Sequence, residues 1–570
     1  MGTAPAPPQA NPRQSAPFRR QRVREPGRRF GAGPPDSRFN AFVAKTGTDH
    51  RETRLPEAEK VFIRNSLCSL TKEGRVNRTA SVIATCAAFV VLFAAIVARA
   101  AADAAWPPYS PDSWAYVDLA KTLFSDFYRI GHARSWLTGS YSAAFPPLWP
   151  LVIALGQLAG LGPLCGLTIG WALVAASVAL LALAGRRAGA GVGPALVTGA
   201  LLVWHPAFAE EVSAGRSLSL TIFLVAALAV SLTSTRPAWR AASAGMLLGL
   251  MVMTRFDSLL WAVPIAALMG WRDGPRLLGL AFLTWLAALS PWILYSMVQF
   301  GTVFATDNSW VATSAVAGTF VTDYPPRAAQ TLWTAPLQWA SLKLSGLPAL
   351  KDALWQSPGP MGRALIGIAL LVGLAALIRR GNGPPLVARW PLLGLGLAPV
   401  MSLPAYLATG YTDERYFAPL AASLVFGGLV VSVGRGRGNQ LLSILATAAT
   451  AWALIVTVPQ IGRPAPADPL DRDRAMVLAH CLSTEPQPVL VIMDDAIAAA
   501  RFSALYGIRT GFLPANFARE DVGATLRAAF IADKHPTHFL DLNGIAPDVF
   551  ADASIAMDCP LPLKRIALAR

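Results

Sequence analysis

The sequence predicts an α-helical polytopic membrane protein with about eleven transmembrane helices and a small C-terminal α/β domain. Two features of its composition indicate this class. Of the 570 residues, 54% are hydrophobic and 14% are charged, whereas about a quarter of the residues of a soluble protein are charged. The apolar residues also form runs of roughly 18 to 25, enough for a helix to cross a hydrocarbon core of about 30 Å. A soluble core does not require such runs.

The N-terminal tail, residues 1–78, is basic and poor in apolar residues. It holds sixteen Lys and Arg but only seven Asp and Glu, so nine of the sixteen net positive charges precede the first span. Its mixture of Pro, Gly and Arg predicts a disordered cytoplasmic arm. Because this charge lies beside a membrane span, the sequence favours membrane lipids as its partner and no nucleic acid.

Positive charges predict the topology of the transmembrane domain, residues 79–460. The first span covers residues 79–101, and Lys and Arg beside a span stay on the cytoplasmic side. The later short basic loops fall on the same side. The protein is therefore expected in the cell (inner or plasma) membrane with a cytoplasmic N-terminus and an extracytoplasmic C-terminus. The segments expected outside are residues 102–162, 206–216, 301–362 and 409–416.

Residues 461–570 have an ordinary charge content and are expected to form the extracytoplasmic α/β domain. Residues 471–483 and 496–505 read as helices, and the segments PVLVIMDD and THFLDLNG read as strands. Cys481 and Cys559 both fall in this domain. A disulfide persists in an oxidising compartment, but the sequence leaves open whether these two cysteines pair.

Asp112 opens a segment expected on the outer membrane face. It follows Pro111 and precedes apolar residues at helical spacing, which makes it a candidate N-cap. Capping alone would account for it. A carboxylate at this face would also suit a general base that takes a proton from an acceptor hydroxyl. Asp118, further along the segment, is expected on the solvated face and is a second candidate.

A second acidic cluster lies in the next outside loop. Glu210 and Glu211 stand at the mouth of a span, and Arg216 enters the following one. One interpretation is a polar turn closed by a Glu–Arg ion pair. Alternatively, the paired carboxylates orient an acceptor or bind a divalent cation, the one cofactor that the sequence leaves open.

Two arginines are candidates for binding phosphate. Arg255 interrupts an apolar run together with Asp257, and Arg415 lies at the outside entrance of a span. Charges inside a membrane cost about 2.5 to 3.5 kcal/mol, so they mark functional positions. The guanidinium group pairs bidentately with phosphate oxygens and suits a lipid phosphate. The alternative for Arg255 is a pair with Asp257. The alternative for Arg415 is snorkelling or a pair with Asp413 or Glu414.

Four short segments together resemble a known family. They are Asp112 with Ser113 and Tyr116, the run Pro146, Pro147 and Leu148, the Thr–Arg pair at Arg255, and ERYFAPL at residues 414–420. In order, spacing and sidedness they are similar to the C-type (GT-C) glycosyltransferases that use polyprenyl-phosphate sugars. The similarity is to the branch that contains the protein O-mannosyltransferases and the lipid A aminoarabinose transferase.

The resemblance implies a hexosyl or pentosyl transferase with a GT-C-like transmembrane domain. It implies a polyprenyl-phosphate sugar as donor, an extracytoplasmic acceptor (a cell-envelope glycan, a lipid or a protein) and inversion at the anomeric carbon. Asp112 falls on the family's catalytic aspartate and would be the general base, while Arg255 and Arg415 would bind the donor phosphate. From the residues themselves, we expect the acceptor or second acidic site to comprise Glu210, Glu211 and Arg216, together with Tyr116 of the first motif.

The chain departs from the family pattern at two positions. Ser113 stands where many relatives have a second acid, so a paired-acid metal site is not expected there. Arg216 and Ser217 stand where some relatives have an acid, so Glu210 and Glu211 do not align with it directly.

Two other functions use similar features. A transporter or flippase of lipid-linked glycans also needs charges in the membrane, but such proteins commonly have two related halves, and this sequence has no obvious internal repeat. A noncatalytic glycolipid-binding membrane protein would tolerate the loss of Asp112.

Overall fold

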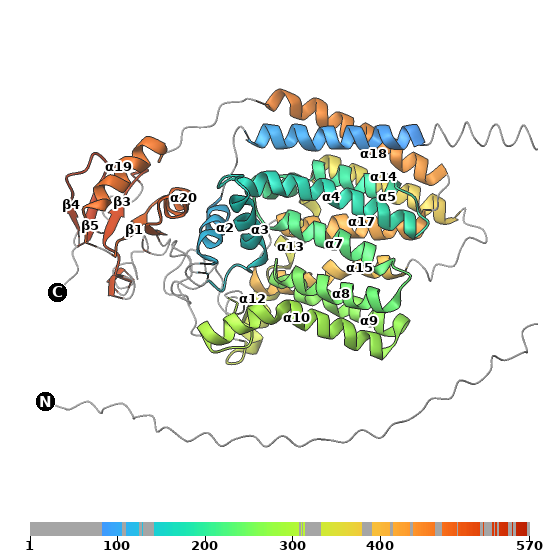
Figure 1. The fold of residues 1–570 in the computed structure, drawn as a ribbon, viewed down its shortest axis with the longest axis horizontal. Coiled ribbons are helices and arrows are strands. Elements are labelled where there is room, and N and C mark those ends of the chain that lie inside the picture. The colour runs from blue at the N-terminus through green and yellow to red at the C-terminus, as the bar shows by residue number, and fades with distance from the viewer. Residues whose placement is uncertain are drawn as a thin grey trace, which may run out of the picture. The chain divides into compact units, whose positions relative to one another are not determined.

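The computed structural model describes residues 82–104, 110–124, 128, 142–306, 309, 312–313, 332–378, 390–410, 414–433, 437–461, 470–486, 488–513, 517, 527–528, 530–532, 535–544, 550 and 554–566. The basic tail predicted for residues 1–78 lies outside these ranges. The described residues form a large helical region followed by a C-terminal region that contains a β-sheet (Figure 1).

Six helices are long and apolar enough to cross a membrane, by length and composition. They are Val82–Ala104, Cys165–Arg187, Pro275–Phe300, Pro391–Thr409, Glu414–Ser432 and Gly438–Gln460. Two further pairs of helices pass the same test but bend at a short break: Pro206–Ser213 with Leu218–Leu232 by 109°, and Pro336–Gln356 with Gly359–Ala375 by 77°. The chain is therefore a multi-pass membrane protein. The described residues give six to eight spans, so the count of eleven stays a prediction.

The helical region begins with Val82–Ala104 and continues through shorter and longer helices. They are α2 (Pro111–Thr122), α3 (Leu148–Leu158), α4 (Cys165–Arg187), α5 (Gly193–Trp204), α6 (Pro206–Ser213), α7 (Leu218–Leu232), α8 (Pro237–Val252), α9 (Ala262–Asp273), α10 (Pro275–Phe300), α12 (Pro336–Leu344), α13 (Leu347–Gln356), α14 (Gly359–Ile378), α15 (Trp390–Leu397), α16 (Leu403–Thr409), α17 (Ala418–Ser432) and α18 (Arg437–Thr457). Short 3-10 helices join some of them: η1 (Phe256–Trp261), η3 (Ala398–Ser402), η4 (Glu414–Phe417) and η5 (Val458–Gln460).

Small residues allow helices α8 and α10 to pack closely. Gly245 and Gly249 lie one turn apart on α8, and both face the backbone of α10. A Cβ atom on Gly249 would lie 2.8 Å from the carbonyl oxygen of Trp285, closer than side-chain carbons approach backbone. Two small residues spaced by four are a common device for close helix contact in membranes.

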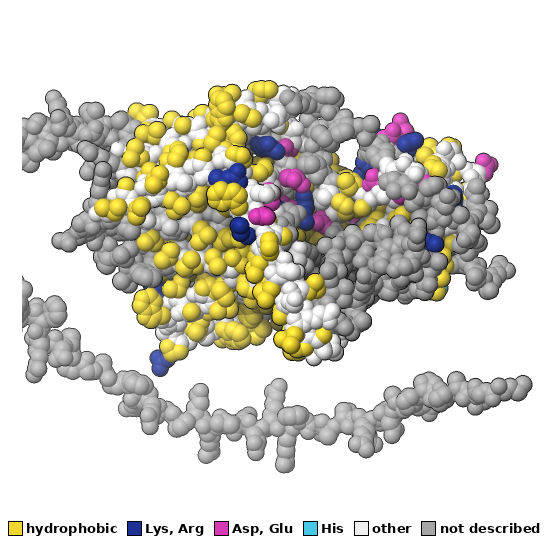
Figure 2. All heavy atoms as spheres, turned by 180° about the vertical axis from the view of Figure 1, so that it is seen from behind, with side chains coloured by type: hydrophobic (Ala, Val, Ile, Leu, Met, Phe, Trp, Pro, Cys, Tyr) yellow, Lys and Arg dark blue, Asp and Glu magenta, His cyan; other side chains and the backbone are white. Residues whose placement is uncertain are grey.

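The outer surface of the helical region is apolar. Figure 2 shows hydrophobic side chains over much of its described surface, with the charged side chains gathered in patches. Long spans leave large aliphatic side chains exposed, for example Val90, Val298 and Leu371 at 68%, 77% and 68%. Soluble monomers rarely expose apolar patches of more than a few hundred Å². This surface is suited to contact with lipid.

The C-terminal region contains a five-stranded mixed sheet in the order β2-β1-β3-β5-β4. Its strands are β1 (Leu490–Met493), β2 (Arg509–Phe512), β3 (His538–Leu540), β4 (Ser554–Ala556) and β5 (Leu563–Ile566). Strand β1 pairs in parallel with β2 and β3, while β5 pairs antiparallel with β3 and β4. The helices α19 (Arg472–Ser483) and α20 (Ala496–Tyr506) precede and follow β1. The four elements predicted from the sequence are thus confirmed as α19, β1, α20 and β3.

Strand β1 is buried on both faces, which explains its uninterrupted apolar sequence. Val491 and Met493 pack into one cluster with residues of α19 and α20. Leu490 and Ile492 point to the opposite face and pack with Phe539. Alternate side chains of one strand therefore supply two separate cores.

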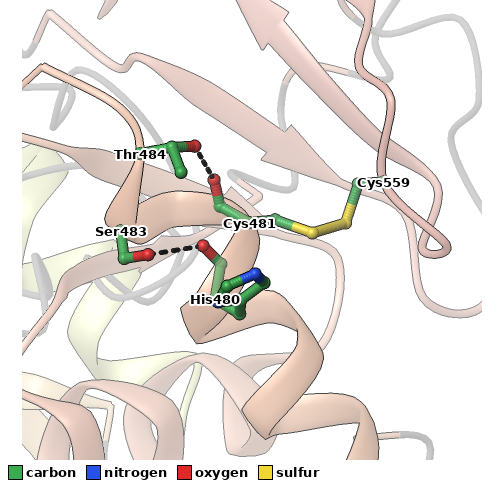
Figure 3. Close-up of a disulfide and its surroundings, with 5 residues drawn as sticks. All are labelled: His480, Cys481, Ser483, Thr484 and Cys559. Carbon is green, nitrogen blue, oxygen red and sulfur yellow. Dashed lines mark hydrogen bonds between the residues drawn. A yellow bond between two sulfur atoms is a disulfide. The ribbon is translucent and has the colours of Figure 1, made fainter.

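Cys481 and Cys559 form a disulfide, which resolves the pairing that the sequence left open. Their Cα atoms lie 6.1 Å apart across 78 residues of sequence. The bond joins the last turn of α19 to the segment between β4 and β5 (Figure 3). It therefore fixes the antiparallel edge of the sheet to the helix that opens the region.

Candidate functional site

Helix α2 presents Asp112 in its first turn, but Asp112 is not the N-cap that the sequence predicts. Ser110 is the N-cap: its hydroxyl accepts from the backbone N–H of Ser113, and the side chain of Ser113 accepts from the N–H of Ser110. This reciprocal capping box satisfies the helix end without the carboxylate. Capping therefore does not account for Asp112.

Arg415 links the start of α2 to helix α6. One terminal nitrogen of its guanidinium lies 3.1 Å from a carboxylate oxygen of Glu211 and 3.9 Å from a carboxylate oxygen of Asp112. The Glu211 side chain is buried, while those of Arg415 and Asp112 are 23% and 20% exposed. The contacts with Glu211 and Asp112 explain the position of Arg415 without the pair with Glu414 that the sequence leaves open. The other residue considered there, Asp413, lies outside the described residues.

The sharp bend between α6 and α7 brings Arg216 back onto α6. Its guanidinium lies 2.7 Å from Glu211 and 3.2 Å from Glu210. Gly215 makes the turn with a φ of +66°, a conformation that glycine adopts readily. Its carbonyl oxygen accepts a hydrogen bond of 2.8 Å from the indole N–H of buried Trp149 on α3. The Glu–Arg ion pair that is one interpretation of the sequence is therefore present, and Glu211 also contacts Arg415.

Arg255 lies between α8 and η1 and pairs with Asp257. The two nitrogen–oxygen distances are 3.1 and 3.4 Å. Asp257 also accepts a hydrogen bond from the hydroxyl of Tyr406. The structure therefore contains the Arg255–Asp257 pair that was the alternative interpretation of the sequence, and Tyr406 of α16 anchors it.

Tyr416 brings the two arginines together. The guanidinium carbon of Arg255 lies 4.9 Å from the centre of its ring, and that of Arg415 lies 5.1 Å from it. Arg415 also donates to the Tyr416 hydroxyl at 3.3 Å. Guanidinium groups are attracted to the faces of aromatic rings. Tyr416 thus positions two cations at the start of the Glu414–Ser432 span.

Tyr116 closes the cluster on the side of α2. Its hydroxyl donates to the hydroxyl of Ser217 at 3.3 Å. Burial raises the pKa of Tyr116 to about 12, although the hydrogen bond to Ser217 opposes this. Tyr116 therefore stays protonated at neutral pH and contributes a hydroxyl rather than a charge.

The acidic side chains of the site face arginines. A divalent cation takes several oxygen ligands, but Glu210 and Glu211 already face Arg216, and Glu211 and Asp112 face Arg415. Among the residues that the structure describes, no three acidic, histidine or cysteine side chains are grouped as metal ligands.

Contacts connect six of the candidate side chains, and Tyr116 joins them through Ser217, which follows Arg216 in the sequence. The contacts link Asp112, Arg415, Glu211, Arg216 and Glu210, and Tyr416 links Arg415 to Arg255. Sequence reasoning missed Tyr406 and Tyr416. The adjacency of Tyr416 to Arg415 in ERYFAPL was the available signal, whereas nothing local marks Tyr406.

Asp118 is not on a solvated face, contrary to the expectation. It is 5% exposed and accepts a hydrogen bond of 3.4 Å from Ser503 of α20. Trp114 and Val117 of α2 pack beside it against Ala500 and Ala504 of α20. Asp118 therefore takes part in the contact between α2 and α20 and does not join the charged cluster.

No family model matches the chain, and no curated protein matches it. Several solved structures match it. The archaeal oligosaccharyltransferase AglB of Archaeoglobus fulgidus, in complex with an inhibitory peptide and a dolichol-phosphate, is 12% identical with a TM-score of 0.45, over 79% of this chain and 69% of AglB. ArnT of Cupriavidus metallidurans, bound to undecaprenyl phosphate, is 14% identical with a TM-score of 0.39, over 86% of this chain and 98% of ArnT.

At these identities and TM-scores, the likeness assigns no substrate and no catalytic residue to this chain. Both proteins are glycosyltransferases of the GT-C superfamily, and it is this superfamily that the sequence motifs of the chain resemble.

Proposed function

We propose that this chain is a membrane glycosyltransferase. It would move a sugar from a polyprenyl phosphate to an acceptor on the extracytoplasmic side, with Asp112 as the general base. One observation carries this proposal: Arg415 contacts Glu211, lies 3.9 Å from Asp112 and shares the ring of Tyr416 with Arg255. A candidate base and two candidate phosphate ligands are therefore neighbours.

The position of the arginines supports a lipid-linked donor. Arg415 stands at the beginning of the Glu414–Ser432 helix, which is long and apolar enough to span a membrane. A phosphate bound there can leave a long prenyl tail along the apolar surface of the helices. A nucleotide-linked sugar would gain nothing from that surface.

The reaction is a single displacement. The acceptor oxygen forms a bond to the anomeric carbon, while the bond from that carbon to the phosphate oxygen of the lipid breaks. Asp112 takes the proton of the acceptor hydroxyl, and the lipid leaves as its phosphate. Arg255 and Arg415 stabilise the negative charge that develops on the leaving phosphate. Attack opposite the leaving group inverts the anomeric carbon.

Donor binding would also change the surroundings of Asp112. At 3.9 Å, its contact with Arg415 is longer than a hydrogen bond. A donor phosphate that accepts from two guanidinium N–H groups of Arg415 would be a closer partner than Asp112 is. Arg415 would then turn toward the phosphate, and Asp112 would lose a neighbouring cation that stabilises its charged form.

The remaining residues of the site would orient the acceptor. Tyr116 supplies a neutral hydroxyl near Ser217, and Glu210 is 65% exposed while it pairs with Arg216. The α20 helix contacts α2. The C-terminal region is therefore close enough to the candidate base to select the acceptor.

The test uses the full chain reconstituted in liposomes with polyprenyl phosphates that carry a radiolabelled hexose or pentose. We expect free polyprenyl phosphate to be released in step with labelled product when cell-envelope extract is added as acceptor. A flippase would move the labelled lipid between leaflets with the sugar still attached. A binding protein would retain the lipid without turnover. Either of these results, with no released lipid phosphate for any sugar, would contradict the proposal.

A further inference from the structure

His205 lies at the break between α5 and α6 and is completely buried. Its Nδ1 atom accepts a hydrogen bond of 3.1 Å from the backbone N–H of Phe208, so the ring caps the N-terminus of α6. Its Nε2 atom lies 2.8 Å from the hydroxyl of Ser357. Both nitrogens of this ring are therefore engaged, one by each neighbouring segment.

The partners of His205 and Ser357 determine which group donates in each of these hydrogen bonds. The hydroxyl of Ser357 lies 2.7 Å from the backbone carbonyl oxygen of Glu414, and a carbonyl can only accept. Ser357 therefore donates to Glu414 and accepts from His205. The Nδ1 atom of His205 is an acceptor, so the proton of the neutral ring is on Nε2, as this arrangement requires.

These bonds join the two backbone segments that carry the central ion pair of the site. Helix α6 carries Glu211, six residues after His205, and Arg415 follows Glu414 directly. The side chains of Glu211 and Arg415 meet at 3.1 Å. His205 and Ser357 form a second, neutral connection between the same two segments.

The segment that carries Ser357 is tightly packed against the start of α6. Ser357 is completely buried. Gly359, two residues later, has a φ of +66°, and a Cβ atom there would lie 3.2 Å from the ring of Pro206. Ser357 therefore has little freedom to move away from His205.

We propose that His205 and Ser357 are positioning residues that hold Arg415 in place for the phosphate of the donor. This inference rests on the proposed function, because it assigns Arg415 to that phosphate. Neither residue touches the donor. They act through the Glu414 carbonyl, which fixes the backbone from which the Arg415 side chain extends. A displaced arginine would bind phosphate more weakly even in a protein that is folded.

Two single variants break the connection in different ways. Ser357→Ala removes one oxygen atom and leaves the cap of α6 intact. His205→Asn loses the contact with Ser357 but keeps a good N-cap residue. Ser177→Ala is the matched control, because Ser177 is equally buried and donates to the carbonyl of Leu173 within its own helix.

The experiment measures the affinity of the full chain in nanodiscs for decaprenyl phosphate, together with its thermal midpoint. We expect each single variant to bind about 5- to 10-fold more weakly, the loss typical of one hydrogen bond. The double variant should bind no more weakly than either single variant, because both break the same connection. Ser177→Ala should bind like the wild type.

Two results would overturn the inference: single variants that are folded and bind the probe with wild-type affinity, or losses that add in the double variant. Arg415→Ala separates this inference from the proposed function. If Arg415→Ala also binds normally, the phosphate role of Arg415 fails and the proposed function fails with it. If only Arg415→Ala loses affinity, the proposed function stands and the positioning role is wrong.

Discussion

Arg415 contacts Glu211 at 3.1 Å although 204 residues separate them in the sequence. Glu211 also faces Arg216, so one buried carboxylate contacts two guanidinium groups. This arrangement joins the α6–α7 bend to η4, the short helix that precedes α17. The stability of the site therefore depends on Glu211 more than on its neighbour Glu210.

Replacement of Glu211 tests this dependence. Glu211→Gln leaves two arginines facing a neutral amide, and the loss of one partner from a buried ion pair costs roughly 3 to 5 kcal/mol. Glu210→Gln is the matched control, because that side chain is 65% exposed and its pair is worth at most about 1 kcal/mol. Thermal unfolding in detergent should show a much lower midpoint for Glu211→Gln only. Equal midpoints for the two variants would contradict the shared role of Glu211.

The sequence was sufficient to predict the residues of the site but not all of their partners. Asp112, Glu211, Arg255 and Arg415 could be found because charged groups are costly in an apolar chain. The contact of Arg415 with Glu211 could not be predicted, because it depends on how distant helices pack. The N-cap was misassigned because Ser110 and Asp112 are both suitable residue types, and only the backbone decides between them.

The fold was predictable to the same degree. Long apolar runs predict spans well. In two places, however, an apolar segment forms two helices with a sharp bend between them, and hydropathy alone does not predict the bend. Asp118 was misplaced because α20, which buries it, lies almost 400 residues further along the chain. The apolar run of β1 identified a strand that is covered on both faces.

The disulfide should stabilise the C-terminal region. A cross-link across 78 residues is worth about 4.5 kcal/mol by the chain-entropy argument. We expect Cys559→Ser to make this region more sensitive to limited proteolysis, with cleavage sites identified by mass spectrometry. Cys86→Ser is the control, because Cys86 is a free cysteine on the surface of a membrane span. A cleavage pattern in Cys559→Ser that matches the wild type would argue against this role.

His538 should make the stability of the sheet depend on pH. Burial lowers the pKa of His538, against the effect of Glu485 at 3.6 Å, and Arg565 lowers it further. Between this pKa and the ordinary value near 6.5, the unfolded state binds more protons than the folded state. The contribution of His538 to the free energy of unfolding is therefore fully present above about pH 6.5. It is lost as the pH falls through the pKa of His538 in the folded protein.

Hydrogen exchange of strand β3, corrected for the intrinsic pH effect, measures this dependence. We expect protection to fall on acidification in the wild type and to respond less in His538→Gln. His480→Gln is the control, since His480 is exposed on α19. The same pH response in His538→Gln and in the wild type would show that another group is responsible.

The contact between α2 and α20 should keep the candidate base in place. Ala504 is completely buried among Trp114 and Val117. Ala504→Glu would force a charge into this contact close to Asp118, so we expect the amides of α2 to exchange about tenfold faster or more. Leu505→Glu is the control, because Leu505 is 43% exposed on the same helix. Unchanged exchange in Ala504→Glu would mean that α2 is held by other elements.

The central claim is that Asp112 acts in sugar transfer and not in donor binding. The most direct measurement compares Asp112→Asn with the wild type, both for transfer from the radiolabelled donor and for affinity for decaprenyl phosphate. Asp352→Asn, which changes an exposed acid on α13, is the control. The account predicts a loss of transfer of about 10²- to 10⁴-fold in Asp112→Asn with donor affinity retained. Transfer at the wild-type rate by Asp112→Asn would contradict it.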